Sequence, residues 1–130
     1  MLKADSDIEK YIPQRPPFVF IDAVELVDAQ QARTSFTVTD ACPLVKDGVL
    51  PLAGLMENAA QTCAARAGNT IGYIGAVKQM EVMRFPRIGE TITTEAKVVQ
   101  EVLNICLMDV TARVGDELIA TTTLKIAIIG

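Results

Sequence analysis

Residues 51–67 read PLAGLMENAAQTCAARA, and this stretch decides the fold because it is the one long segment with a helical pattern. Proline suits the first turn of a helix, since its missing N–H would be unpaired there, and Gly68-Asn69 suits the end. Apolar residues lie almost all round the predicted helix: Leu52, Leu55, Met56, Ala59, Ala60, Cys63, Ala64 and Ala67. A helix of this kind is buried in the centre of a domain. We therefore predict a helix over 51–67 with other elements wrapped around it.

The segments on both sides of this helix have the composition of β-strands. Before the helix, residues 18–27 are rich in Phe, Val and Ile, and residues 32–38 alternate between polar and apolar side chains. After the helix, we predict four more strands, over 73–85, 91–103, 105–114 and 117–128. Gly75 predicts a bend, and Gly115-Asp116 predicts a two-residue hairpin turn.

An antiparallel sheet wrapped around a single helix explains an apolar helix in so short a chain. The predicted fold class is therefore α+β, in the arrangement called the hotdog fold, with residues 1–130 forming a single domain. Because exposed sheet edges in this fold normally pair with another subunit, we expect a dimer.

Charge and residue counts exclude several classes of function. The chain has 16 acidic and 12 basic residues, and this net charge of -4 argues against binding to nucleic acid or an anionic membrane surface. No apolar run reaches the roughly 18 residues that a membrane span needs, and the N-terminus shows no secretion signal. The 3 widely spaced cysteines suit reduced thiols, so we expect a cytoplasmic protein. With no histidine, we predict no metal site and no histidine general base.

Three stretches, in order along the chain, resemble a known enzyme family. The first is IPQRPPF at 12–18, followed by Asp22; the second is DGVLP at 47–51, which runs into LMENAAQ at 55–61; the third is Arg84, followed by GETI at 89–92. Together they resemble the hotdog-fold 3-hydroxyacyl-[acyl-carrier-protein] dehydratases of the FabZ/FabA type. The pattern is most similar to that of the aryl-polyene-type dehydratases. The resemblance spans roughly residues 8–95.

This resemblance implies a role in fatty-acid or polyene lipid synthesis, with acyl thioesters as substrates. It implies no bound cofactor, because the substrate is carried on the phosphopantetheine of acyl carrier protein or coenzyme A. In the family, a histidine and a helix glutamate divide the proton transfers across a dimer interface, and Glu57 matches that glutamate. Gln61 lies four residues further on, where it can orient the carboxyl group, and Asn58 extends the polar stripe. The helix N-terminus at Pro51 and Leu52 can present a backbone N–H to the thioester oxygen.

Glu57 is a carboxyl group in the middle of a predominantly apolar helix. We expect desolvation there to disfavour its charged form. Because a buried carboxylate is costly without a partner or a task, Glu57 is either a catalytic group or a structural one bonded to Gln61 or to a partner chain.

The chain departs from the family pattern where histidine is expected. Gln14 stands where the first motif usually has histidine. Depending on the alignment, Pro43 or Val49 occupies the position of the catalytic histidine in the loop before the helix, and neither side chain can move a proton. Leu52 replaces the glycine that usually follows the helix-leading proline.

Three functions remain open at this point. The first is dehydration of a 3-hydroxyacyl thioester by Glu57 alone or with an unusual helper. The second is hydrolysis, because some thioesterases of this fold use a helix carboxylate without histidine. The third is a partner subunit, inactive alone, in a heterodimer with a histidine-bearing hotdog protein. Acyl carrier protein is a further expected partner. Lys78, Arg84, Arg87 and Lys97 are candidates for a basic patch that receives it, but the favoured interpretation is that these four residues are scattered, solvated charges.

Overall fold

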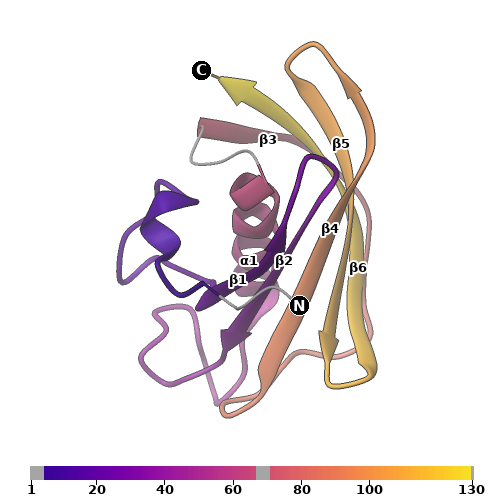
Figure 1. Ribbon diagram of the computed structural model, residues 1–130. Coiled ribbons are helices and arrows are strands. Elements are labelled where there is room, and N and C mark those ends of the chain that lie inside the picture. The colour runs from indigo at the N-terminus through magenta and orange to yellow at the C-terminus, as the bar shows by residue number, and fades with distance from the viewer. Residues whose placement is uncertain (1–4, 67–70, 130) are drawn as a thin grey trace.

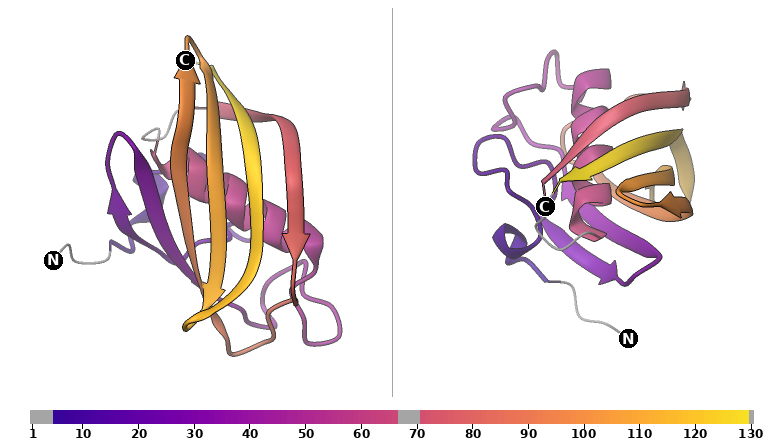
Figure 2. Two further views of the ribbon diagram at one scale, coloured as in Figure 1. Left: turned by 90° about the vertical axis from the view of Figure 1, so that its right-hand side faces the viewer. Right: turned by 90° about the horizontal axis from the view of Figure 1, so that it is seen from above.

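The structure is a computed structural model that describes residues 5–66 and 71–129. Its elements, in chain order, are η1 (Ile8–Lys10), β1 (Ala23–Val27), β2 (Gln31–Thr37), α1 (Leu52–Arg66), β3 (Ile71–Val82), β4 (Thr91–Val102), β5 (Ile105–Val114) and β6 (Glu117–Ile129). The six strands form one antiparallel sheet in the order β1-β2-β4-β5-β6-β3. Figures 1 and 2 show this sheet curving around α1. The predicted architecture, an antiparallel sheet wrapped around one helix, is confirmed.

Two local predictions about the strands are confirmed. The pairing of β3 with β6 shifts register between Ile74 and Ala76, which places the irregularity at Gly75. Gly115 and Asp116 form the turn between β5 and β6, and Gly115 has a φ of 58°, which favours glycine. The predicted signal for the end of the helix, Gly68-Asn69, lies outside the described residues.

The first strand begins later than predicted, at Ala23 instead of residue 18. The N–H of Phe20 donates to Oε1 of Gln61 at 2.7 Å, and Nδ2 of Asn58 donates to the carbonyl of Phe20 at 2.7 Å. Two side-chain amides of α1 therefore satisfy backbone groups that a sheet would otherwise pair. This segment consequently packs against the helix instead of extending the strand.

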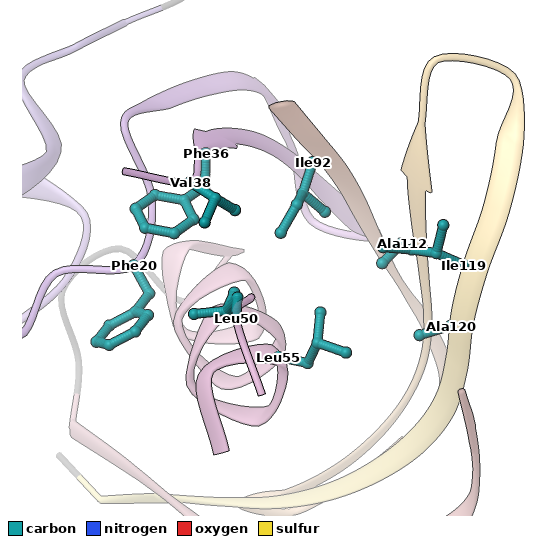
Figure 3. Packing of buried hydrophobic residues seen from close by; sticks show 9 residues of the cluster. All are labelled: Phe20, Phe36, Val38, Leu50, Leu55, Ile92, Ala112, Ile119 and Ala120. Carbon is teal, nitrogen blue, oxygen red and sulfur yellow. The ribbon is translucent and has the colours of Figure 1, made fainter. Parts of the chain in front are cut away.

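The core lies between α1 and the concave face of the sheet. Figure 3 shows Leu50 and Leu55 at the helix, facing Ile92, Ala112 and Ile119 from the sheet. Leu50 is fully buried, and a Cβ added at Gly54 would overlap with its Cδ1. The glycine in the first turn of α1 is therefore required by close packing.

Helix α1 is buried on only part of its circumference. Its buried side chains include Leu55, Asn58, Ala59 and Thr62. Glu57 and Ala53 are exposed, and Leu52 is 46% exposed. The prediction that α1 is buried all round is therefore wrong for the single chain, because the sheet and the N-terminal segment leave one side of the helix without a cover.

The concave face of the sheet is also uncovered at its β3 end. Ile74 and Val77 of β3 pair with Ile126 and Leu124 of β6, which point inward and are buried. Nevertheless, Ile74 is 42% exposed and Val77 is 44% exposed. Among the described strands, β3 pairs only with β6, whereas the opposite edge of the sheet is bridged at Val24 by Asp5. We call the exposed side of α1 and the β3 end of the concave face the open side of the molecule.

The loop after β3 is held by the guanidinium of Arg84. It donates to both carboxylate oxygens of Glu90, at 2.7 and 2.8 Å, and to both oxygens of Glu117, at 2.9 and 3.0 Å. The hydrogen bonds from Arg84 and from the N–H of Arg87 lower the pKa of Glu90 from 4.5 to about 2. The same guanidinium lowers the pKa of Glu117. This paired network fixes the approach of the chain to β4.

We expect the stability of the fold to depend on pH through Glu90. Because its pKa is lower in the folded chain than in the unfolded chain, ionised Glu90 stabilises the fold fully above pH 4.5. This contribution is lost as the pH falls towards about 2. Thermal unfolding across this window should show a shallower decline of Tm for Glu90→Gln than for the wild type. Glu95→Gln, which removes a carboxylate with no ion pair among the described residues, should follow the wild type. Identical slopes for Glu90→Gln and the wild type would contradict the prediction.

Candidate active site at helix α1

The exposed carboxylate of Glu57 is anchored by one side chain. Nε2 of Gln61, four residues further along α1, donates to Oε2 of Glu57 at 3.2 Å. The same nitrogen donates to the carbonyl of Phe18 at 3.1 Å, and Oε1 of Gln61 accepts from the N–H of Phe20. These two backbone contacts orient the amide of Gln61 so that its nitrogen faces the carboxylate. The structure therefore brings Gln61 to Glu57, as the helical spacing predicts, and the catalytic role of the pair stays a prediction.

Asn58 does not join this pair. It is 1% exposed, its Nδ2 donates to the carbonyl of Phe20, and its Oδ1 accepts from the hydroxyl of Thr94 at 2.6 Å. Both ends of its amide are therefore used in bonds within the core. The structure separates Asn58 from the carboxylate, because neighbours in a helix sequence point about 100° apart around its axis. In this chain, Asn58 clamps the N-terminal segment and β4 to the helix.

Pro51 and Leu52 form the N-terminal end of α1. The carbonyl of Pro51 accepts from the N–H of Gly54 at 3.0 Å and of Leu55 at 3.1 Å. The first N–H groups of a helix have no acceptor within the helix, and the partial positive charge of its dipole lies at this end. The N–H of Leu52 is therefore suited to an oxygen acceptor, and its role at a thioester stays a prediction.

Exposure of Glu57 corrects the expectation that the helix desolvates it. The carboxylate faces the open side of the molecule and is exposed in the single chain. It can therefore be desolvated only by something that covers this side. The exposure of Glu57 was not predicted, because a helix that is apolar almost all round gives no indication of which side stays exposed.

The candidate basic patch does not form, in agreement with the favoured interpretation of scattered charges. Arg84 is occupied by Glu90 and Glu117, while Lys78 on β3 and Lys97 on β4 are separated by β5 and β6. The structure instead brings Lys46 close to Arg87, because both residues form β-bridges with Val49 in the loop before α1. Their side chains are exposed, and neither has an ion pair within the described part of the chain. Sequence spacing alone carried no signal for this contact.

The alternatives to Glu57 as a reactive group are a set of metal-ligating side chains and the buried thiol of Cys63. Within residues 5–66 and 71–129, no three His, Cys, Asp or Glu side chains are grouped so that they could hold a metal ion. Burial raises the pKa of the Cys63 thiol to about 12, so this side chain is a protonated core residue at neutral pH. No helix in the described ranges has the length and apolar character needed to cross a membrane.

The comparison with known families decides the assignment. A family model described as ApeP-like, ApeP dehydratase, matches residues 6–127. The chain belongs to the ApeP-like dehydratase family. The resemblance inferred from the three sequence motifs is thereby confirmed, and the chain is a dehydratase-like hotdog protein.

Individual relatives agree with this family. The chain is 28% identical over 141 residues to a 3-hydroxyacyl-[acyl-carrier-protein] dehydratase FabZ of Clostridioides difficile (strain 630), covering 99% of each sequence. Its fold is similar to a chain of the dehydratase heterocomplex ApeI:P from Xenorhabdus doucetiae, with a TM-score of 0.87, 15% identity, and coverage of 95% of this chain and 91% of that chain. A hypothetical thioesterase protein with coenzyme A from Streptococcus pneumoniae TIGR4 gives a TM-score of 0.70 at 14% identity, covering 82% and 84%. At these identities, the two solved structures support the hotdog fold alone.

Proposed function

We propose that this chain contributes Glu57 to a composite dehydratase site for 3-hydroxyacyl thioesters, completed by a histidine from a second hotdog subunit. Dehydration requires a base to remove the proton beside the carbonyl, an acid to protonate the departing hydroxyl, and donors for the developing enolate oxygen. Glu57 can serve as the acid, and the helix N-terminus at Leu52 offers a donor. The 130 residues contain no histidine to serve as the base.

The observation that carries this proposal is the open side of the molecule. Ile74 and Val77 are inward-facing apolar residues that remain more than two fifths exposed, and Glu57 lies on the uncovered side of α1. Exposed apolar surface of this kind marks an interface. A subunit seated there would exclude water from the carboxyl group. Desolvation would favour the neutral carboxylic acid, which is the form that can donate a proton.

A second copy of this chain would cover the open side without bringing a histidine. A different hotdog subunit supplies both the cover and the base. The solved relative described as a dehydratase heterocomplex supports an assembly of two unlike chains. We therefore propose a heterodimer as the active form, with the proton beside the carbonyl passing to the partner's histidine and Glu57 releasing the hydroxyl as water.

Gln61 has a positioning role in this proposal. Because its nitrogen is bonded to Oε2 of Glu57, the other carboxyl oxygen is the one left to meet the substrate hydroxyl. The bonds from Gln61 to the backbone of Phe18 and Phe20 prevent the amide from turning its oxygen towards the carboxylate. The carboxyl group is thus held in one orientation before substrate arrives.

We propose that the substrate is carried on the phosphopantetheine arm of acyl carrier protein or of coenzyme A, with no cofactor bound to the chain itself. Lys46 and Arg87 are exposed cations near the N-terminal end of α1, where the thioester oxygen would bind. A phosphate on the arm carries the complementary charge. These two side chains are exposed basic contacts near the helix end of the proposed site.

The test is a reconstitution with a 3-hydroxyacyl carrier-protein thioester. The purified chain, a histidine-bearing hotdog dehydratase subunit, and the mixture of both are assayed by mass spectrometry for the enoyl product and for free thiol. We expect enoyl product from the mixture at a rate at least about tenfold above either protein alone. Enoyl product formed equally by the chain alone would overturn the composite site, and free thiol without enoyl product would assign the chain to hydrolysis.

A further inference from the structure

Phe18 carries a large apolar side chain on a backbone that is fixed at both ends. Its N–H donates to the carbonyl of Arg15 at 3.0 Å, and its own carbonyl accepts from Nε2 of Gln61. The side chain is nevertheless 59% exposed, whereas Phe20, two residues further on, is 1% exposed in the core. Phe18 is thus an aromatic residue held in place outside the core.

The fixed backbone of Phe18 lies next to the proposed acid. One atom, Nε2 of Gln61, donates both to the Phe18 carbonyl and to Oε2 of Glu57. Two acceptors of the same nitrogen must be close neighbours, because each lies within hydrogen-bond distance of it. The residue that carries the exposed ring is therefore a close neighbour of the residue that carries the exposed carboxyl group.

An acyl thioester presents the two features that match this region. Its 3-hydroxyl group needs the carboxyl group, and its acyl chain gains free energy when it leaves water for an apolar surface. Aromatic rings provide a large contact area at a small loss of conformational freedom. We infer that the ring of Phe18 is a wall of the acyl-thioester site and packs against the acyl chain beyond the reacting carbons. This inference rests on the function proposed above and adds a residue that selects for acyl length.

The sequence contains no tryptophan, so Phe18→Trp would place a single indole reporter at this wall. Fluorescence of this variant, mixed with the histidine-bearing subunit, is titrated with N-acetylcysteamine thioesters of 3-hydroxybutyrate and of 3-hydroxyoctanoate. We expect a saturable blue shift with the longer thioester and a much smaller one with the shorter. Phe85→Trp is the matched control, because Phe85 is also an exposed phenylalanine, at 40%, and belongs to the loop after β3. It should show no saturable shift with either thioester.

Kinetics of the assembled enzyme provide the second readout. Phe18→Ala should raise KM for the longer thioester by about tenfold and by clearly less for the shorter one, because only the longer chain reaches the ring. Phe18→Tyr keeps the ring and should restore most of the affinity. Equal effects on both chain lengths would assign Phe18 a purely structural role and overturn the inference.

Two further outcomes separate this inference from the proposed function. If the second subunit alone shifts the fluorescence of Phe18→Trp and thioester adds nothing, the ring is a subunit contact and the inference fails while the composite site stands. If the longer thioester causes a saturable shift but no partner supports turnover, the proposed dehydration is wrong. The contact between the Phe18 ring and the acyl chain is then still supported. Adding Glu57→Gln to the Phe18→Trp chain allows the binding titration to be read without turnover.

Discussion

Glu57→Gln is expected to lower kcat for dehydration by a factor of about 10²–10⁴ in the reconstituted heterodimer. Glutamine has nearly the same shape as glutamate but cannot donate a proton to the departing hydroxyl. The neighbouring amide of Gln61 is held by the backbone of Phe18 and Phe20, so it cannot take over this task. KM should change little, since the acid acts mainly in the transition state.

The measurement is the steady-state rate of enoyl formation with saturating 3-hydroxyacyl thioester, with heterodimer content checked by size-exclusion chromatography. Glu95→Gln, on β4 and away from α1, is the matched control and should retain the wild-type rate. Glu57→Gln in a fully assembled heterodimer with an unchanged kcat would show that the carboxyl group is structural. If Glu57→Gln lowers the fraction of assembled heterodimer but the assembled protein keeps the wild-type kcat, the role of Glu57 is a subunit contact.

Asn58→Leu is expected to destabilise the fold by about 2–4 kcal/mol. Leucine preserves most of the volume but removes both hydrogen bonds of the amide. The carbonyl of Phe20 and the hydroxyl of Thr94 would then be buried without their present partner. After the substitution, both groups stay buried without a hydrogen-bond partner, so their desolvation is no longer compensated. The expected loss of stability therefore exceeds the net contribution of an ordinary hydrogen bond.

Urea unfolding of the purified chain measures this effect. Thr123→Val is the control, because the Thr123 hydroxyl also donates a hydrogen bond, to Asp109 at 2.7 Å, but in an exposed place. It should change the free energy of unfolding by no more than about 0.5 kcal/mol. A loss below about 1 kcal/mol for Asn58→Leu would mean that water or a shifted backbone replaces the amide, against the buried clamp described above.

The secondary structure could be predicted to a large extent because it depends on local patterns. Proline at 51 and the following run of helix-compatible residues indicate α1, and the structure has it at Leu52–Arg66. Gly115-Asp116 indicates a hairpin whose two strands pair as expected. The segment at 18–22 was misassigned, since its strand-like composition says nothing about the side-chain amides of a distant helix that bond its backbone.

The site was only partly predictable. Spacing along a helix is enough to bring Gln61 to Glu57, because residues four apart share a face. Spacing alone did not show that Asn58 turns into the core, because that depends on where Thr94 and Phe20 lie. It also gave no sign that Arg84 is paired with two carboxylates in the fold, because those partners lie 6 and 33 residues further along the chain.

The sequence by itself determined the chemistry that is present: one glutamate and one glutamine on the central helix, and no histidine among 130 residues. Residue counts and helical spacing do not depend on how distant segments pack. The tertiary structure alone decided that Glu57 is exposed, that Phe18 and Glu57 share the Gln61 amide as a donor, and that Ile74 and Val77 remain partly exposed. Burial is set by neighbours far away along the chain, and a residue pattern cannot specify them because the same apolar side chain suits a core and an interface equally well.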